Sequence, residues 1–294
     1  MSKQNTAAIG EPFLLKVIRK VYPVLERTVP PLAYRLAFRL FFTPIRYPVP
    51  EREKPVLARA ETFEHKINGK RTRFYSWGQT GQPLVMVVHG WMGRAGQFYA
   101  LVEALVSQGF HVVGFDGPGH GKSGGHSTNV LEFASAIRYI ADKYGPIHTA
   151  TGHSFGGITI MRAIEEGVKI GRVVMIATPT IASDILVQYQ QKINAGAHTG
   201  EIFEEMIRKR YGFEFKAISV AETVKRIQVP PLLLVHDEDD RDVGIMHARQ
   251  VQQLVPTSQT LFTKGLGHTR ILRHPEVVQR VVAFVRDGMA DKSS

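Results

Sequence analysis

The chain has 294 residues, of which 44% are hydrophobic and 21% charged, a balance typical of a globular protein with a sizeable core and not of a disordered chain. It contains no cysteine, which excludes disulfides, thiolate zinc sites and a cysteine nucleophile and favours a cytoplasmic location. No stretch of the sequence approaches the roughly eighteen consecutive apolar residues of a membrane-spanning helix.

The net charge of +11 is concentrated at one end of the chain. Residues 1–50 contain eight basic and two acidic residues, a balance of +6, which leaves +5 for the other 244 residues. The main part of the protein is therefore close to neutral, and no nucleic-acid partner is predicted. The chain begins Met1-Ser2-Lys3 without an apolar core and a small-residue cleavage site, so no secretory signal is expected.

Residues 13–22 and 32–42 have the spacing of two short amphipathic helices separated by prolines. Basic residues lie on their polar faces, among them Lys16, Lys20 and Arg35. Two interpretations stay open. The favoured one is that these helices pack on the main domain and leave a solvated basic face, and the other is that they lie on an anionic membrane surface.

From residue 58 onward, strand-like and helix-like segments alternate, after a proline-rich linker at residues 44–54. Asn68-Gly69 separates two strand-like segments, residues 60–67 and 71–77, and predicts a β-hairpin. Further strands are predicted at residues 84–88, 112–115, 147–151, 173–176, 232–235 and 260–262. Helices are predicted at residues 98–106, 130–144, 158–164, 245–254 and 277–285. This α/β alternation with apolar strands indicates a mostly parallel central sheet with helices on both faces.

The segment Gly152-His153-Ser154-Phe155-Gly156 lies between a predicted strand and a predicted helix. A serine on such a sharp turn projects its hydroxyl from the sheet, while the helix N-terminus faces any developing oxyanion. Ser123 also lies in a G-x-S-x-G pattern, but glycines and capping residues follow it, so it is predicted to be a loop residue. The Gly-Lys-Ser that ends at Ser123 does not indicate a phosphate-binding loop, because Asp116 occupies the position of that motif's first glycine.

A serine hydroxyl needs a base to remove its proton, and the base needs an acid to orient it. His268, after the last predicted strand, suits the base because an imidazole both accepts and returns a proton near neutral pH. These positions carry a resemblance to the α/β-hydrolase fold family, in particular its small esterase-like and lipase-like serine hydrolases. Five blocks in the family's order carry it: His89-Gly90-Trp91, residues 116–123, residues 152–156, residues 236–240 and Gly265-Leu266-Gly267-His268.

The resemblance implies a catalytic triad of Ser154, Asp240 and His268, and an oxyanion hole formed by the backbone N–H groups of Trp91 and Phe155. Asp240 lies four residues after His236, as in the family's H-G-x-x-D pattern, and Asp239 is the alternative acid. The departure from the pattern is Asp237, which occupies the place of the usual glycine. Most carboxylates of this loop are predicted to belong to a solvated turn or to an adventitious cation site. The Trp91 side chain either lines the acyl pocket or packs at the strand end.

The predicted organisation is a basic helical extension and linker at residues 1–57, an α/β-hydrolase domain at residues 58–288 and a tail at residues 289–294. The resemblance further implies a small helical lid at about residues 178–229, whose apolar side chains cover the nucleophile or attach the lid to the core.

These observations predict a carboxylesterase-like enzyme that cleaves an ester of a small or medium apolar substrate through an acyl-enzyme. Alternatives are a thioester, lactone, amide or carbon–carbon bond as the target, acyl transfer, or a non-catalytic binding or membrane-surface protein with this fold. The twelve histidines form no H-E-x-x-H or H-x-H pair, so neither a metal nor a cofactor is predicted. The expected location is cytoplasmic, with peripheral contact to the inner face of a membrane as the open alternative, and the oligomeric state is undetermined.

Overall fold

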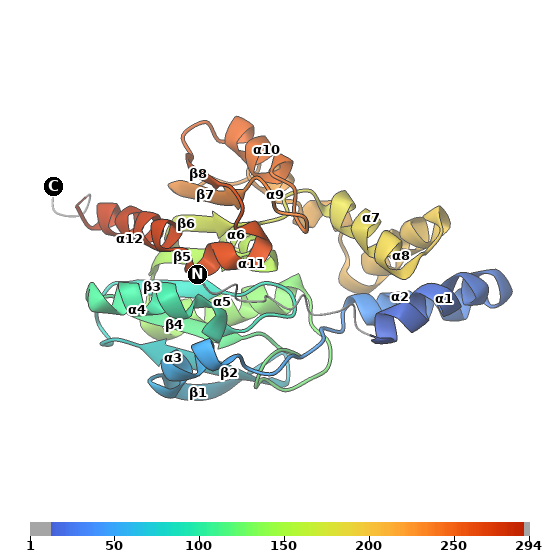
Figure 1. Cartoon of the computed structure of the whole chain (residues 1–294), viewed down its shortest axis with the longest axis horizontal. Coiled ribbons are helices and arrows are strands. Elements are labelled where there is room, and N and C mark those ends of the chain that lie inside the picture. Colours follow the sequence, from blue (N-terminus) through green and yellow to red (C-terminus); the bar gives the residue numbers. More distant parts are fainter. Residues whose placement is uncertain (1–12, 291–294) are drawn as a thin grey trace, which may run out of the picture. The chain divides into compact units, whose positions relative to one another are not determined.

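Figure 1 shows the computed structural model of the chain, which describes residues 13–290. The predicted lack of a secretory signal and the end of the predicted tail fall outside the described residues. Within them, the chain divides into two compact units. Residues 13–41 and Ser183–Phe215 form what we call the helical unit, and Phe42–Ala182 with the chain from Lys216 onward forms the sheet unit.

The sheet unit contains one eight-stranded sheet in the order β1-β2-β4-β3-β5-β6-β7-β8. Its strands are β1 Glu61–Ile67, β2 Lys70–Trp77, β3 Leu84–Val88, β4 His111–Asp116, β5 Ile147–His153, β6 Ile170–Ile176, β7 Leu232–Asp237 and β8 Gln259–Thr263. β1 and β2 pair antiparallel with their neighbours, and all later pairs are parallel. This arrangement confirms the predicted mostly parallel sheet.

The helices of the sheet unit alternate with these strands along the chain. They are α3 Lys54–Ala58, α4 Tyr99–Ser107, α5 Val130–Tyr144, α6 Phe155–Glu165, α9 Val220–Thr223, α10 Met246–Leu254, α11 Gly267–Arg270 and α12 Pro275–Ala290, with short 3₁₀ turns at Glu51–Glu53, Ala95–Phe98 and Ile271–Arg273. A further 3₁₀ turn, Phe215–Ile218, begins at the last residue of the helical unit. The hairpin between β1 and β2 turns at Asn68 and Gly69, both with positive φ, as a tight two-residue turn requires.

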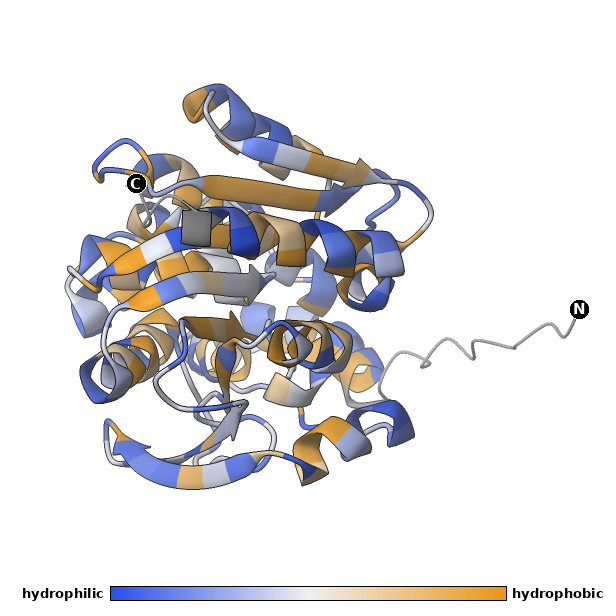
Figure 2. Ribbon diagram, turned by 90° about the vertical axis from the view of Figure 1, so that its left-hand side faces the viewer, coloured by the Kyte–Doolittle hydropathy of each residue, from blue (hydrophilic) through white to orange (hydrophobic). Residues whose placement is uncertain are grey.

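Strand β3 shows how the sheet builds the core, because all five of its residues are buried. Val85 and Val87 belong to a cluster that includes Leu105 of α4 and Val281 of α12, so these helices cover one face. Side chains alternate along a strand, which directs Met86 to the opposite face, where α5 and α6 pack together. Figure 2 shows the apolar residues along the central strands, while the helices carry polar residues on one side.

The helical unit contains α1 Phe13–Thr28, α2 Pro30–Phe41, α7 Ala182–Ile193 and α8 Ala197–Tyr211. Helix α1 does not end at Pro23 as the sequence predicted, but continues to Thr28. Proline cannot donate to the carbonyl four residues earlier, which here belongs to Arg19. The side-chain amide of Asn194 donates to that carbonyl oxygen at 3.5 Å, so the lost backbone hydrogen bond is replaced.

Among the described helices, none combines the length and the hydropathy that crossing a bilayer requires.

The segment predicted as a linker is fastened to the sheet unit by arginines. Arg46 donates to the carbonyl oxygens of Gly119, Ser123 and Gly125 at 2.7–2.9 Å. The residues of this segment belong to the sheet unit, which begins at Phe42.

Arg94 makes the second attachment and is itself buried. It donates to the carbonyl oxygens of Tyr47 and Pro48 at 3.0 and 2.8 Å. Its guanidinium also lies 3.5 Å from the Glu53 carboxylate, which is equally buried. Arg94 therefore compensates a buried charge and holds the strap formed by residues 42–53.

We expect Arg94→Ala to lower the free energy of unfolding by about 3 kcal/mol, because the Glu53 charge would stay buried without its partner. Arg59→Ala is the matched control, since Arg59 pairs with Glu103 at the surface and its loss should cost less than about 1 kcal/mol. Urea denaturation at neutral pH measures both. Equal losses in the two variants would contradict a structural role for Arg94.

Candidate active site

Ser154 occupies the turn between strand β5 and helix α6, and its backbone is strained. Its φ of 51° and ψ of −119° are unfavourable for a residue with a Cβ atom. The turn is held by a hydrogen bond from the Ser154 N–H to the carbonyl oxygen of Ile176 at 2.9 Å, and by one from the Gly157 N–H to the Ser154 carbonyl oxygen at 3.0 Å. Ser154 is partly exposed and lies at the carboxyl end of β5.

The glycines around Ser154 are required by close backbone packing. A Cβ atom on Gly152 would lie 2.5 Å from the nitrogen of Gly157, and one on Gly156 would lie 2.1 Å from the carbonyl oxygen of Val88. A Cβ atom on Gly90 would lie 2.9 Å from the Cβ of Ser154. The loop after strand β3 and the turn after strand β5 are therefore in direct contact.

Asp240 and His268 form a hydrogen-bonded pair. The His268 Nδ1 lies 2.8 Å from the Asp240 Oδ2, and because a carboxylate only accepts, Nδ1 carries the proton. The Asp240 side chain is fully buried, and that of His268 is 15% exposed. Burial alone would raise the pKa of Asp240, but hydrogen bonds from His268, Val243 and Asp242 outweigh it and hold this pKa below its usual value.

His268 also contacts the residue that precedes Ser154. The Nε2 of His153 donates to the carbonyl oxygen of His268 at 2.8 Å, and the two rings lie 4.7 Å apart. Burial, together with the nearby His268, lowers the pKa of His153 to about 3. His153 is therefore neutral and acts as a fixed hydrogen-bond donor that ties the His268 loop to the Ser154 turn.

Trp91 and Phe155 flank Ser154 from two different loops. Phe155 is the first residue of α6, where a backbone N–H has no acceptor within the helix. The rings of Trp91 and Phe155 meet edge to face, with centroids 5.4 Å apart. Both side chains are partly exposed and form an apolar surface beside the serine.

Two buried histidines fix the loop that carries Trp91. His89 accepts the Gly117 N–H at 2.8 Å and donates to the Gly90 carbonyl oxygen. His120 accepts the Met92 N–H at 3.0 Å and donates to the Pro118 carbonyl oxygen. Burial lowers their pKa values to about 4 and about 3, so each ring stays neutral and can both accept and donate.

One group of side chains in the described range has the composition of a metal site. Ligand atoms of Asp240, Asp242 and His268 lie within 4.8 Å of one another. However, the Asp240 Oδ1 accepts the N–H groups of Asp242 and Val243, and its Oδ2 accepts from His268. Both oxygens are thus used within the protein, which favours an orienting role for this carboxylate.

Comparisons with known proteins agree with this architecture. Residues 83–204 match the family model of the alpha/beta hydrolase fold. The chain is 37% identical over 89 residues to a human serine hydrolase-like protein, a match that covers 28% of this chain and 43% of that protein, so the match spans less than half of the relative.

One further sequence match and one structural match each cover most of the chain. It is 24% identical over 273 residues to a bifunctional esterase/perhydrolase of Acinetobacter calcoaceticus, covering 72% of this chain and 95% of the relative. The structure of a bacterial membrane phospholipase A is similar with a TM-score of 0.62 and 17% identity, over 94% of this chain and 97% of that one.

The chain has the α/β-hydrolase fold. The second G-x-S-x-G pattern of the chain follows strand β4, whereas Ser154 follows strand β5. Ser123 is buried, its Oγ donates to the Asp116 carbonyl oxygen, and it accepts the Arg73 N–H at 2.8 Å. It therefore joins strand β2 to the end of strand β4.

Asp237 is a site residue that the sequence did not identify. It replaces the family's usual glycine, is fully buried, and accepts hydrogen bonds from the Thr263 hydroxyl at 2.8 Å and the Leu266 N–H at 2.9 Å. Burial opposes its ionisation, but these and neighbouring backbone donors hold its pKa below the usual value. Its carboxylate therefore anchors the loop that carries His268. The sequence did hold a signal for this role, because Asp237 stands where the pattern usually has a glycine. The acidic residues next to it suggested a solvated turn instead.

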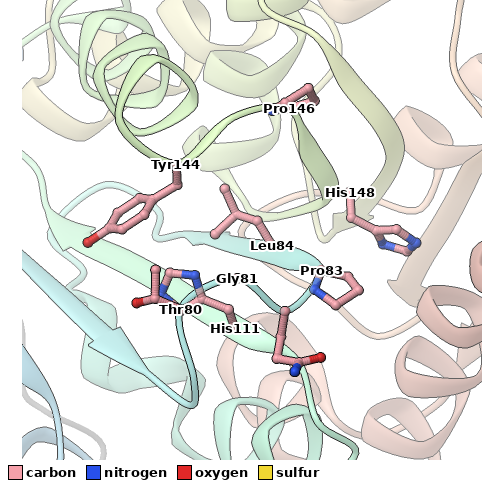
Figure 3. A pocket seen from close by; sticks show the side chains of 9 residues that line it. Thr80, Gly81, Pro83, Leu84, His111, Tyr144, Pro146 and His148 are labelled. Atoms are coloured by element: carbon pink, nitrogen blue, oxygen red, sulfur yellow. The ribbon is translucent and has the colours of Figure 1, made fainter.

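A cavity lies at the opposite end of the parallel strands (Figure 3). Its lining includes Leu84, His111 and His148, at the amino ends of β3, β4 and β5, together with Thr80 and Tyr144. Ser154 follows the carboxyl end of β5, and ligands of open α/β sheets bind at the carboxyl ends. This cavity is therefore separate from the candidate active site.

We expect Asp237→Asn to lower the free energy of unfolding by about 1–3 kcal/mol at pH 7, because buried donors lose their charged acceptor. The folded-state pKa is below the unfolded one, so the carboxylate stabilises above about pH 3.9 and this contribution is lost as the pH falls through the folded-state pKa. Urea denaturation at pH 7 and near pH 3 measures the difference in free energy of unfolding between the wild type and the variant. This deficit should be smaller near pH 3 than at pH 7. Asp239→Asn, at an exposed position of the same loop, is the control and should change little. A deficit that is the same at both pH values would contradict the role of the charge.

Proposed function

We propose that this protein is a serine hydrolase that cleaves a carboxylic ester of a small or medium apolar substrate through an acyl-enzyme intermediate. One observation carries the proposal: the buried Asp240 carboxylate accepts the Nδ1–H of His268, whose carbonyl oxygen is bound by the residue before Ser154. The esterase activity in the name of the Acinetobacter relative supports an ester as the target.

In this mechanism Ser154 Oγ attacks the ester carbonyl carbon while His268 Nε2 accepts the hydroxyl proton. Asp240 keeps the proton on Nδ1, which leaves Nε2 as the basic nitrogen, and stabilises the imidazolium that forms. Collapse of the tetrahedral intermediate breaks the carbon–oxygen bond, and the departing alcohol takes the proton from His268. Water, activated by the same imidazole, then cleaves the acyl-enzyme and releases the acid. The reaction needs no cofactor.

The negative charge of the tetrahedral intermediate would be stabilised by the N–H groups of Phe155 and Trp91. A donor of this kind contributes about 2.7–4 kcal/mol to transition-state stabilisation. The contact between Gly90 and Ser154 supports this role, because it brings the loop of Trp91 against the nucleophile. The adjoining Trp91 and Phe155 rings favour an apolar acyl or alcohol group.

We expect Ser154→Ala to abolish the burst and the turnover of a short-chain p-nitrophenyl ester, because no acyl-enzyme can form. Intact-protein mass spectrometry with a fluorophosphonate probe should show one adduct on the wild type and none on the variant. Peptide digestion of the labelled wild type is the control, and it should map the adduct to Ser154. A Ser123→Ala variant would not serve as a control, because Ser123 has a structural role and its loss could lower activity indirectly. An alanine variant with full turnover would show that the nucleophile is another residue, and a wild type without adduct or turnover would favour a non-catalytic protein.

Asp240→Asn should lower kcat by about 10⁴-fold, because an amide at this position favours the wrong imidazole tautomer. Asp239→Asn should stay within about twofold of the wild type, since the Asp239 side chain is exposed. Steady-state kinetics of both variants decides between the two candidate acids. A larger loss in the Asp239 variant would reverse the assignment.

A further inference from the structure

One apolar stripe of helix α1 is buried in the helical unit. Tyr22 is 1% exposed and packs in a cluster with Ala33, Ala37 and Ile193. Its hydroxyl forms a hydrogen bond with the Thr199 hydroxyl at 3.0 Å. This stripe accounts for the attachment of α1 to its neighbours, so no other apolar residue of the helix is needed for that purpose.

Helix α1 nevertheless carries a second apolar stripe, which faces outward. Val17, Val21 and Val24 are 38%, 51% and 61% exposed, and their spacing of four and three residues aligns them on one face. Of the nine large hydrophobic side chains exposed in the described range, six lie in the helical unit, which holds under a quarter of the described residues. Exposed apolar groups therefore gather in this unit.

A row of basic residues borders the valine stripe. Lys16, Lys20 and Arg27 are exposed, align on one side of the valines, and form no ion pair within residues 13–290. The single acid of α1 and α2 is Glu26, and it is turned inward, where it accepts the Gly196 N–H at 3.0 Å. The outer surface of α1 is thus apolar along one line and positive along the next.

We propose that this outer surface of α1 binds an anionic membrane surface, with the three valines at the boundary of headgroups and acyl chains and the basic row on the lipid phosphates. Apolar and cationic stripes side by side on one helix are what such an interface requires. A nucleic acid would pair with the basic row but leave the valines in water. A second copy of this chain would bring the same positive charge against it.

Sedimentation of the full chain with lipid vesicles tests the proposal. The wild type should bind vesicles of phosphatidylcholine mixed with phosphatidylglycerol about tenfold or more tightly than vesicles of phosphatidylcholine alone, and this preference should weaken with added salt. The triple variant Val17→Ser, Val21→Ser, Val24→Ser and the triple variant Lys16→Gln, Lys20→Gln, Arg27→Gln should each lose about tenfold or more in affinity for the anionic vesicles.

Two control variants separate this surface from general hydrophobicity and net charge. Met246→Ser with Leu254→Ser removes exposed apolar groups of α10, and Lys169→Gln, Lys225→Gln, Lys264→Gln removes the same charge from the sheet unit. Both should keep wild-type vesicle binding. All variants should keep their thermal stability, because every substituted residue is exposed. Equal losses in the control variants would overturn the proposal, as would valine variants that bind like the wild type. Binding to duplex DNA that depends on the basic row alone, with no vesicle binding, would indicate a polyanion site instead.

Discussion

Ser154 adopts its strained backbone because the chain must pass from strand β5 into helix α6 within one residue, while the loop after β3 presses against the turn. Three glycines make this possible, since a side chain on any of them would collide with backbone or with the serine itself. The strain is tolerated because β5 is hydrogen-bonded on both sides within the sheet. The rigid sheet thus determines the direction in which the hydroxyl points.

Five titratable side chains around that turn are buried, and hydrogen bonds hold each of them in place. Neutral imidazoles at His89, His120 and His153 use one nitrogen or both to bind backbone groups of the surrounding loops. Carboxylates at Asp237 and Asp240 stay ionised because several donors converge on them. Such a network has few alternative arrangements, because changing one proton would leave a buried partner unsatisfied. It preserves the geometry of the loops at the carboxyl end of the sheet.

Much of this architecture could be predicted from the sequence. Apolar runs such as residues 84–88 identified the strands because a buried parallel strand needs no polar face, and the glycines around Ser154 identified the turn. The pairing of Asp240 with His268 followed from family spacing. Other features depend on contacts between distant residues. Pro23 lies inside a helix because Asn194 replaces its hydrogen bond, and Arg46 fastens a proline-rich segment that resembles a free linker. Asp237 was missed because its donors come from another strand and loop.

The core of the helical unit draws on two segments that are far apart in the chain. Tyr22 and Thr199, which bond to each other there, are separated by 177 positions. During synthesis, α1 and α2 leave the ribosome well before α7 and α8 exist, so their inner apolar stripes have no partner for most of translation. The segment that precedes the first six strands of the sheet thus waits for a partner that follows them in the chain. Strands β7 and β8 follow α8 in the chain, so all helices of the helical unit have been synthesised before the last two strands of the sheet.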